Sequence, residues 1–412
     1  MARAAAFSGW RMVAICFFIM NCTLGANFAA YGALVEAIQR EYGTSRALAS
    51  MGISMVTLAL GLLAPLVGGL LRKVSIRTVI LTGLALNGGG YLLLTQATGI
   101  GAFLAIYGLL IGPGFALAGV VPCTAIVSNW FAEGRGRAIG LINIPLGNAL
   151  LPLAAAALMA HFGLSGALAG NGLLLLALFP LAWFLVDTPE RIGQAPLGRV
   201  ATAAVPVGEP PLRAIEILRL PQFAVLTLGV ALLSAAGLVM VAHLVPLALD
   251  RGIPLAQASL LLSVFGLAGL IGAPLFGWLA DRIGAGRSMA ALSLAWIAPW
   301  LALLVAGDSL PLLLALAFVI GLLSNGILTL FGVLAGEWLG DANVPLGMGL
   351  CYLFKIPFLF AAAPLAGAMF DRSGSYAPTI LLHVTSFALI GAVFLIYRPR
   401  AVATEPGTLE PA

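Results

Sequence analysis

Charged residues are scarce in this sequence. Asp, Glu, Lys and Arg make up 8% of its 412 residues, whereas soluble domains carry about 25%. Hydrophobic residues make up 61%, which excludes an ordinary water-soluble domain and predicts a polytopic membrane protein. The net charge of +5 does not indicate binding to nucleic acid, because the basic residues are placed as membrane topology requires.

Motifs for catalysis and cofactor binding are also absent from the sequence. It contains no phosphate-binding glycine-rich loop, no G-x-S-x-G or H-E-x-x-H motif and no cluster of His, Cys and Asp residues. The four cysteines lie in apolar stretches without the spacing of metal ligands, and we expect buried thiols at Cys16, Cys22, Cys123 and Cys351. We therefore expect neither an enzyme nor a metal or cofactor site. Any uphill work must draw on a gradient or on an exchanged solute.

Apolar runs long enough to span a bilayer fall into two sets of six. The first set lies at 10–37, 47–71, 78–97, 101–130, 138–161 and 164–186, and the second at 222–248, 255–279, 288–306, 310–336, 346–370 and 376–397. The predicted fold class is all-α integral membrane, with twelve transmembrane helices in two six-helix bundles related by pseudo-twofold symmetry. We expect an N-terminal bundle at 1–186, a cytoplasmic linker at 187–221, a C-terminal bundle at 222–397 and a cytoplasmic tail at 398–412.

The positions of the basic residues predict the orientation. Arginines and lysines concentrate at the termini and in the even-numbered loops, and the exceptions at the opposite face are Arg40, Arg46, Arg251 and Arg372. Cytoplasmic loops carry an excess of Lys and Arg. Both termini are therefore predicted to be cytoplasmic, in a multi-pass protein of the cell inner membrane.

The two halves of the sequence repeat each other. APLVGGL at 64–70 in the second span matches APLFGWL at 273–279 in the eighth, at an offset of 209 residues. Repeated six-span units are typical of transporters whose substrate site lies near the bilayer midplane, at the interface of the repeats.

One ionisable residue stands near the centre of a predicted span. Lys355 lies in the middle of span eleven, and no carboxylate is predicted at a comparable depth. A cation at the centre of a spanning helix costs about 2.5–3.5 kcal/mol. The alternative is a lysine that snorkels to an interface, but its stem is short for that distance. We predict that Lys355 is the counter-charge for a transported organic anion.

Other polar residues within the spans are candidates for contact with the substrate. Tyr352 shares a helical face with Lys355, because residues three apart are neighbours on a helix. The remaining candidates are Asn27 and Tyr31 in span one, Thr124 in span four, Asn143 in span five and Asn325 in span ten. The alternative for each is packing or hydrogen bonding between helices.

His243 lies in the outer half of span seven. Histidine is the side chain whose ordinary pKa lies near neutrality, so His243 is a candidate proton carrier or gate. Packing against a backbone carbonyl group is the alternative.

A loop motif follows span eight. It reads Gly277-Trp-Leu-Ala-Asp281-Arg282-Ile-Gly284, with Arg287 further on, and it matches the G-x-L-x-D-R-x-G motif of the major facilitator superfamily, which the chain resembles over essentially its whole length. The resemblance implies that this loop latches helices at the cytoplasmic side in one transport state. The first-half copy has Arg72 at the acidic position, which departs from the motif. The alternative for Asp281 and Arg282 is a surface ion pair, worth little energy.

Four further segments and the lysine of span eleven carry a narrower resemblance. The segments are SGWRMV at 8–13, TSRALAS at 44–50, SNWFAEGRGRAIGL at 128–141 and HLVPLALDRGIP at 243–254. They resemble the monocarboxylate porter and oxalate:formate antiporter group. That resemblance implies a second substrate-binding cation, an arginine in span eight, but span eight carries no charge here. We therefore expect a monovalent substrate.

Together these features predict a secondary active transporter of a small, monocarboxylate-like organic monoanion that works by alternating access as a monomer. Its partners are the anion, a proton or an exchanged anion, and the lipid bilayer. One alternative is a proton-coupled drug or metabolite efflux pump, although such pumps usually need an acid within the membrane. Another is a membrane sensor or scaffold that has stopped transporting.

Overall fold

The computed structural model describes residues 7–71, 73–133, 135–198, 212–340, 343–397 and 399. These residues form helices and short loops, with one isolated β-bridge between Phe131 and Leu197. The predicted all-α membrane fold is confirmed. Arg72, residues 199–211 of the predicted linker and nearly all of the predicted tail lie outside the described residues.

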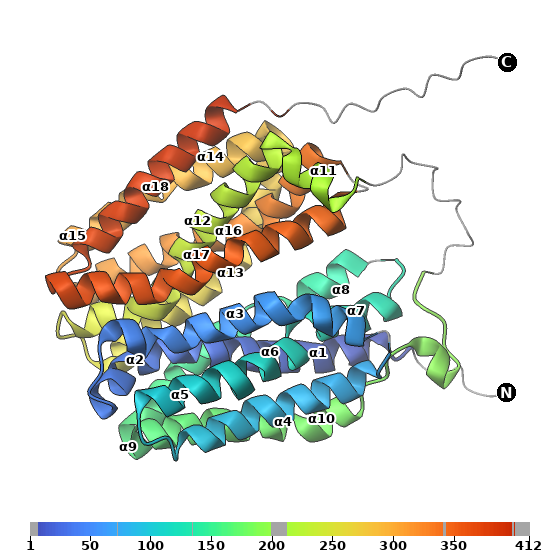
Figure 1. Ribbon diagram of the computed structural model, residues 1–412, viewed down its shortest axis with the longest axis horizontal. Coiled ribbons are helices and arrows are strands. Elements are labelled where there is room, and N and C mark those ends of the chain that lie inside the picture. Colours follow the sequence, from blue (N-terminus) through green and yellow to red (C-terminus); the bar gives the residue numbers. More distant parts are fainter. Residues whose placement is uncertain are drawn as a thin grey trace.

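The helices of the first half form one bundle, shown in blue to green in Figure 1. Lipid offers no hydrogen-bond partner to the backbone, so each apolar run satisfies its own N–H and C=O groups as a helix. The elements are α1 (Gly9–Leu24), η1 (Gly25–Ala29), α2 (Ala30–Glu41), α3 (Arg46–Leu70), α4 (Ile76–Leu94), α5 (Ile100–Ile106), η2 (Tyr107–Ile111), α6 (Gly112–Ala118), α7 (Val120–Trp130), α8 (Arg135–Ile142), α9 (Leu146–Ala177), α10 (Phe179–Trp183) and η3 (Pro189–Ile192).

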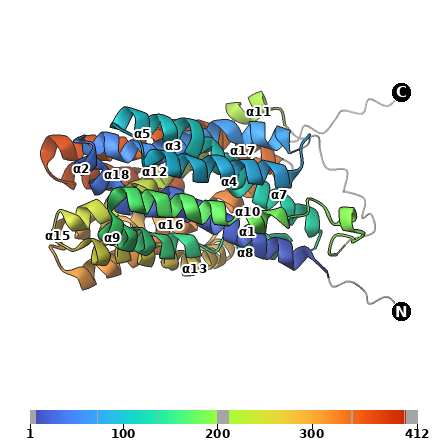
Figure 2. The ribbon, with the colours of Figure 1, turned by 90° about the horizontal axis from the view of Figure 1, so that it is seen from below.

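The helices of the second half form a bundle beside the first, in yellow-green to red in Figure 1. Figure 2 shows α2 and α15 toward one end of the molecule and α7 and α11 toward the other. The elements are α11 (Ala214–Arg219), α12 (Pro221–Leu249), α13 (Leu255–Ile283), α14 (Ala285–Ala295), α15 (Ile297–Val305), α16 (Leu310–Leu339), α17 (Val344–Ser373) and α18 (Ala377–Ile396).

Spans five and six are joined by a chain reversal at Gly163. Eleven helical stretches of the described chain are long and apolar enough to cross a membrane, and one of them, Arg137–Trp183, has 47 residues, which is about 70 Å of helix. Gly163 interrupts it with φ 66° and ψ −168°, a conformation that favours glycine. A Cβ added to Gly170 would lie 2.3 Å from Leu158 Cδ1. Residues twelve apart are about 18 Å apart along a straight helix, so the chain must reverse between them. The stretch therefore contains both predicted spans, 138–161 and 164–186.

Several spans depart from the continuous helices that the sequence predicts, and spans six and nine do so at Leu178 and Trp296. Span one contains the π-helical turn η1, span four contains η2 and a kink at Gly119, and span five breaks at 143–145 between α8 and α9. Pro145 explains the last break, since proline has no N–H and disfavours helix at the residue before it. Asn21 fills the gap: its Oδ1 accepts a hydrogen bond from Gly147 N at 2.8 Å, and its Nδ2 lies 3.5 Å from the carbonyl oxygen of Ile142.

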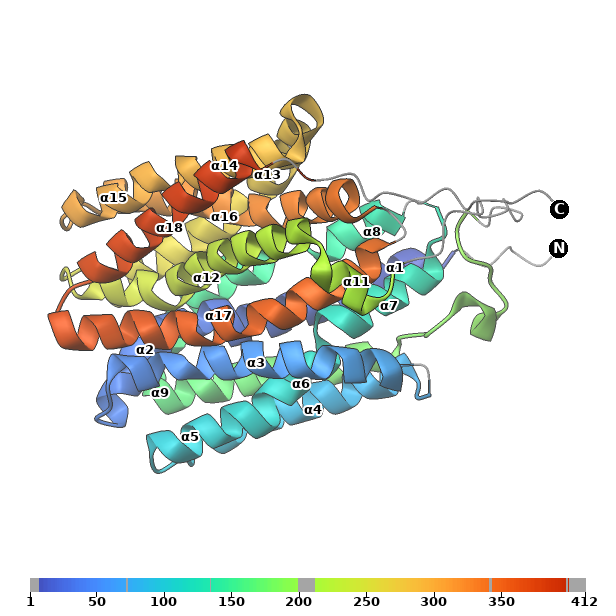
Figure 3. The same ribbon diagram turned by 45° about the horizontal axis from the view of Figure 1, so that its top comes forward.

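Helices α3 and α17 form one side of the contact between the two bundles. Cβ atoms at Gly367 and Gly61 would lie 2.6 Å from Ala47 N and 2.4 Å from Ile356 Cδ1, so the helices touch through their glycines. Figures 1 and 3 show these helices side by side at one end and diverging toward the other. The end where they meet contains loops 42–45, 250–254 and 374–376, and we call it the outer end, after the predicted orientation.

Two further helix pairs contribute to the contact between the bundles. Helix α2 meets α12 at Gly32, where a Cβ would lie 2.1 Å from the carbonyl oxygen of Val241. Helix α9 meets α13 where Gly266 faces Asn148. A Cβ on Gly266 would lie 3.1 Å from the Cβ of Asn148. Small residues therefore allow close approach of the backbones, as is usual between membrane helices.

Replacing Gly32 by alanine is expected to destabilise the protein, because a Cβ has no room beside the Val241 carbonyl group. Overpacking costs about 1–3 kcal/mol, so the thermal unfolding temperature in detergent should fall. The matched control is Gly89→Ala in α4, where a Cβ meets nothing within 4 Å and stability should be unchanged or raised. Equal effects of the two substitutions would show that the contact at Gly32 is dispensable.

Candidate functional site

Lys355 lies near the middle of α17. At 1.5 Å per residue it is about 16 Å from Val344 and about 27 Å from Ser373. Only 9% of the residue is exposed. The structure therefore buries this cation at mid-depth and does not bring it to either helix end.

Two aromatic rings adjoin the Lys355 ammonium group. Its Nζ lies 4.0 Å from the ring centroid of Tyr352, one turn earlier on α17, and 6.0 Å from that of Phe331 on α16. The two rings meet edge to face at 5.8 Å between centroids. Three ion pairs occur among the described residues, and none includes Lys355: Glu36–Arg40, Arg46–Asp250 and Asp187–Arg191.

The aromatic contacts compensate only part of the cost of burying this charge. Cation–π contacts contribute about 0.5–2 kcal/mol, whereas a lysine at the centre of a spanning helix costs about 2.5–3.5 kcal/mol. An ammonium group has three N–H donors, and aromatic faces do not replace hydrogen-bond acceptors. The arrangement is therefore suited to a guest with a negative charge.

The turn of α17 that carries Lys355 borders both halves of the protein. Ile356 packs against Gly61 of α3, and Cys351 Sγ lies 3.0 Å from the hydroxyl group of Thr227 on α12. Lys355 thus belongs to the part of the second half that faces the first, where repeat transporters bind their substrates.

The predicted candidates Asn27 and Tyr31 are fully buried within the first bundle. Asn27 Nδ2 donates to the carbonyl oxygen of Thr23 at 2.7 Å and lies 3.5 Å from Asn87 Oδ1. The Tyr31 hydroxyl group donates to the carbonyl oxygen of Ala49 at 2.6 Å. The structure therefore joins these residues to helices of their own half, and a substrate contact for them stays a prediction.

Asn325 lies on α16 and packs against α13. Its Nδ2 donates to the carbonyl oxygen of Gly321, one turn earlier, at 2.9 Å. A Cβ on Gly269 of α13 would collide with the Asn325 amide group. The side chain thus contributes to contact between two helices, which is the alternative that the sequence leaves open.

Asn143 and Thr124 lie in the irregular parts of the first bundle. Asn143 is exposed in the break of span five and donates to the carbonyl oxygen of Ile139 at 2.8 Å. Thr124 is half-buried on α7. Both stay predictions as substrate contacts.

His243 is 1% exposed and lies near the outer end of α12. Its Nε2 is 2.8 Å from the carbonyl oxygen of Ala363, and its Nδ1 is 3.0 Å from the Tyr376 hydroxyl group. Because a carbonyl oxygen only accepts, Nε2 carries the proton, and Nδ1 of the neutral ring accepts from Tyr376. The Tyr376 oxygen also accepts from Arg46 of α3 at 3.1 Å. His243 therefore packs on a carbonyl group and adjoins a contact between the halves.

The loop motif forms the end of α13 and the turn into α14. Gly284 has φ 87°, which explains the glycine at this position. The guanidinium carbon of Arg282 lies 4.4 Å from the ring centroid of Trp278, and Asp281 and Arg287 are exposed. No ion pair joins Asp281 to Arg282 in the part of the chain that the structure describes. Gating by this loop stays a prediction.

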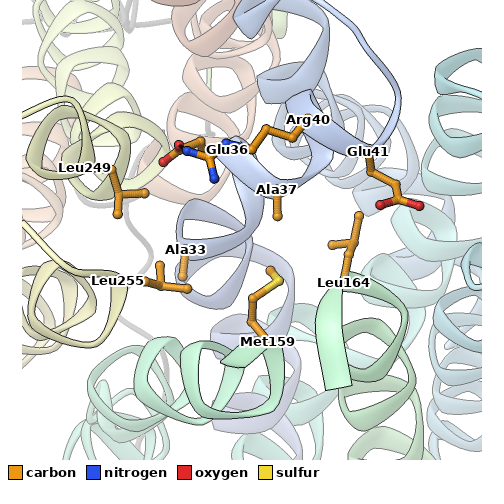
Figure 4. A pocket seen from close by; sticks show the side chains of 9 residues that line it. All are labelled: Ala33, Glu36, Ala37, Arg40, Glu41, Met159, Leu164, Leu249 and Leu255. Carbon is orange, nitrogen blue, oxygen red and sulfur yellow. Dashed lines mark hydrogen bonds and ion pairs between the residues drawn. The ribbon is translucent and has the colours of Figure 1, made fainter. Parts of the chain in front are cut away.

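A recess of about 630 Å³ opens at the outer end between the halves. Figure 4 shows Glu36, Arg40 and Glu41 of α2 on one side and Leu249 and Leu255 of the second half on another. Two carboxylates against one guanidinium group disfavour an organic anion. None of the predicted substrate contacts lines the recess, so it is not the candidate anion site.

A family model described as Major Facilitator Superfamily matches residues 16–253 and 227–411. Monocarboxylate transporter 12-B of Danio rerio is 26% identical over 421 residues, covering 94% of this chain and 86% of that protein. Monocarboxylate transporter 12 of Homo sapiens is 27% identical (95% and 81% covered), and monocarboxylate transporter 13 of Bos taurus is 26% identical (98% and 92% covered). The predicted resemblance to the monocarboxylate group is confirmed, as is transport in place of enzyme chemistry.

Two solved structures share the fold. Both are of a bacterial homolog of the human lysosomal transporter Spinster in an inward-facing conformation, one unoccupied (TM-score 0.66, 14% identity) and one occupied (TM-score 0.65, 12% identity). Each comparison covers 95% of both chains. At this identity the likeness shows the fold alone, and it agrees with the two-bundle architecture predicted from the repeat.

Replacing Lys355 by methionine is expected to stabilise the substrate-free protein. Methionine keeps an unbranched apolar stem and removes a charge whose cost the rings offset only in part, so the thermal unfolding temperature should rise. Lys73, the other lysine of the sequence, is exposed, and Lys73→Met should change nothing. A lower unfolding temperature for Lys355→Met would mean that the ammonium group has a compensating partner within the protein.

Proposed function

The chain belongs to the major facilitator superfamily, and we propose that it carries a small organic monoanion of the monocarboxylate type by alternating access. Lys355 is the counter-charge that binds the anion. A multi-pass membrane protein that moves a small organic substrate follows from the family and the relatives. The sign of the substrate's charge, the role of Lys355 and the mechanism of access are our inference.

The observation that carries this proposal is the environment of Lys355. The ammonium group is buried at mid-depth and touches two aromatic rings, and it takes part in no ion pair among the described residues. A bound carboxylate would supply the missing acceptor, and a charge-assisted hydrogen bond in a site of low dielectric constant is strong. The substrate therefore recovers part of the energy that the protein spends on burying the cation.

The charge of the substrate follows from how many cations face it. Helix α13 has two charged residues, Asp281 and Arg282, both at its end. No second mid-depth cation is thus available from this helix to pair with a second carboxylate, and an unpaired buried carboxylate is costly. A monoanion fits this site better than a dianion.

Alternating access is supported by the division into two bundles that meet through glycine-rich helix pairs. We propose that the bundles rock about Lys355, with both termini cytoplasmic in the inner membrane and the protein working as a monomer. Coupling is through a proton that travels with the anion or through an exchanged anion. Domain limits at 1–186, 187–221, 222–397 and 398–412 belong to the same proposal.

A proton-coupled drug or metabolite efflux pump is less well supported. Such a pump usually needs an acid that takes up protons within the membrane. Asp187 is the one buried carboxylate among the described residues, and it lies past the end of α10, where it accepts from Arg77 N at 3.0 Å and pairs with Arg191 at 3.2 Å. The Asp187 carboxylate therefore already has partners at a helix end, and it does not supply the acid within the membrane.

Substituting Lys355 by glutamine is expected to weaken transport strongly. A hydrogen bond to a charged group contributes about 1.5–3 kcal/mol, which corresponds to roughly 10- to 150-fold in substrate affinity. The measurement is the concentration dependence of radiolabelled lactate and pyruvate uptake into proteoliposomes, with Lys355→Arg retaining part of the activity. The matched control, Lys73→Gln, should behave as wild type. Equal uptake by Lys355→Gln and wild type would remove Lys355 from the mechanism.

Competition between unlabelled acids tests the valency of the site. Monocarboxylates such as pyruvate are expected to inhibit labelled uptake at concentrations at least about tenfold lower than oxalate or malonate, because the second carboxylate of a dianion finds no partner. Stronger inhibition by the dicarboxylates would mean that a second cation reaches the substrate.

A further inference from the structure

Arg46, the first residue of α3, is held by the second half of the chain at the outer end. Its Nη1 and Nη2 donate to Asp250 Oδ2 and Oδ1 at 2.5 and 3.0 Å, the two-bond geometry of arginine with a carboxylate. Nη1 also donates to the Tyr376 hydroxyl group at 3.1 Å, and Nε donates to Gln39 Oε1 at 3.2 Å. Only 5% of the Arg46 side chain is exposed. The pair joins the two halves, with the guanidinium group buried and the Asp250 side chain 31% exposed, and its two-bond geometry distinguishes it from the weak pairs of protein surfaces.

A second carboxylate holds the backbone at the start of α3. The N–H groups of Arg46 and Ala47 donate to Asp371 Oδ1 and Oδ2, each at 3.0 Å. The first N–H groups of a helix lack partners within the helix and favour negative charge, and here α17 of the other half supplies it. The ring of Phe370 lies 3.9 Å from the guanidinium carbon of Arg46. Side-chain and backbone contacts therefore join the same two halves at one point.

His243 orients the Tyr376 hydroxyl group toward Arg46. The neutral imidazole ring donates its Nε2 proton to the Ala363 carbonyl oxygen. Its unprotonated Nδ1 therefore accepts a hydrogen bond from the Tyr376 hydroxyl group. The lone pairs of the Tyr376 oxygen are thereby free to accept from Arg46. The chain of donors runs from Arg46 through Tyr376 and His243 to a backbone carbonyl group, with each donor satisfied.

We propose that Arg46, Asp250, Asp371 and Tyr376 form a latch, here called the outer latch, that closes the outer end, and that neutral His243 is the positioning residue that keeps it engaged. The inference rests on the alternating access proposed above. Because every one of these contacts with Arg46 crosses from one half to the other, the outer end opens only when Arg46 leaves Asp250 and the start of α3 leaves Asp371.

Protonation of His243 weakens the outer latch. The protonated ring is a donor at both nitrogens, so the Tyr376 proton loses its acceptor. The charged groups that face His243 are Arg46 of α3, Asp250 after α12 and Asp371 of α17, with Tyr376 as a further titratable group. A second cation among them competes with Arg46 for the two carboxylates. Since the closed state requires neutral His243 and the open state does not, lower pH favours opening.

The test measures the distance across the outer end in the substrate-free protein. Spin labels are placed on cysteines introduced at Glu41 and Arg372, which are exposed on opposite halves. At pH 7.5 the wild-type protein should show mainly the short distance, and Arg46→Gln and Asp250→Asn should both shift it to a longer one. The matched control is Arg40→Gln, which breaks an ion pair with Glu36 inside α2 and should leave the distance as in wild type. An unchanged distance in Arg46→Gln would overturn the latch.

Acidification tests the role of His243. Histidine ordinarily titrates near pH 6.5, so lowering the pH from 7.5 to 5.5 should raise the ratio of long to short distances by up to about tenfold. In His243→Gln the amide N–H can donate to Ala363 and the amide oxygen can accept from Tyr376, but the side chain takes up no proton. This variant should stay closed at both pH values, and an acid response as large as that of wild type would overturn the assignment to His243.

These distances are independent of the anion that is carried. Opening in a protein that moves no monoanion would contradict the proposed substrate and leave the outer latch standing. Unchanged distances in a transporter that depends on Lys355 would contradict the outer latch and leave the substrate proposal standing.

Discussion

The surrounding lipid offers no hydrogen-bond partner, and most of this structure follows from that constraint. Each apolar run forms a helix, in which the N–H and C=O groups of its backbone bind one another. Where a run is interrupted, a side chain replaces the missing partner, as Asn21 does at the break of span five. Tyr31 and His243 likewise bind carbonyl groups of other helices. Polar residues of the spans are therefore used first to complete the backbone, and a polar group that is not so used stands out as a candidate for binding.

Two buried cations show the two ways in which a charge is kept inside this protein. The Arg46 guanidinium group has acceptors for each of its nitrogens, with a carboxylate of the opposite half as its main partner. The Lys355 ammonium group has two aromatic faces beside it and no ion pair among the described residues, and aromatic faces are weaker partners than a carboxylate. In the roles proposed above, the fully satisfied charge of Arg46 holds the two halves together, whereas the incompletely satisfied charge of Lys355 provides affinity for a solute. Arginine suits the first role because its planar fork matches a carboxylate. Lysine suits the second because its ammonium group is a compact charge on a flexible stem.

The sequence was sufficient for features that depend on neighbouring residues. Hydropathy located the spans and the reversal near residue 163, and helical spacing placed Tyr352 beside Lys355. Contacts between distant segments were not predictable: Phe331 lies on another helix from Lys355, and Arg46 and Asp250 are 204 residues apart. Asn27 and Tyr31 share a helical face as predicted, but periodicity does not tell whether that face meets a solute or another helix. Pro145 marks the break at 143–145, but the sequence does not reveal that Asn21 of another helix supplies the hydrogen-bond partners there.

The reversal at Gly163 has a consequence for how the protein presents itself to the outside. Spans five and six are separated by a single non-helical residue, and the turn carries Phe162, which is 70% exposed. The turn also exposes His161 and Ser165, so it is short and of mixed polarity. So short a turn offers proteases, antibodies and inserted epitope tags little backbone to bind, and in the proposed orientation the loops at 42–45, 250–254 and 374–376 are the better positions for reagents that must not cross the membrane.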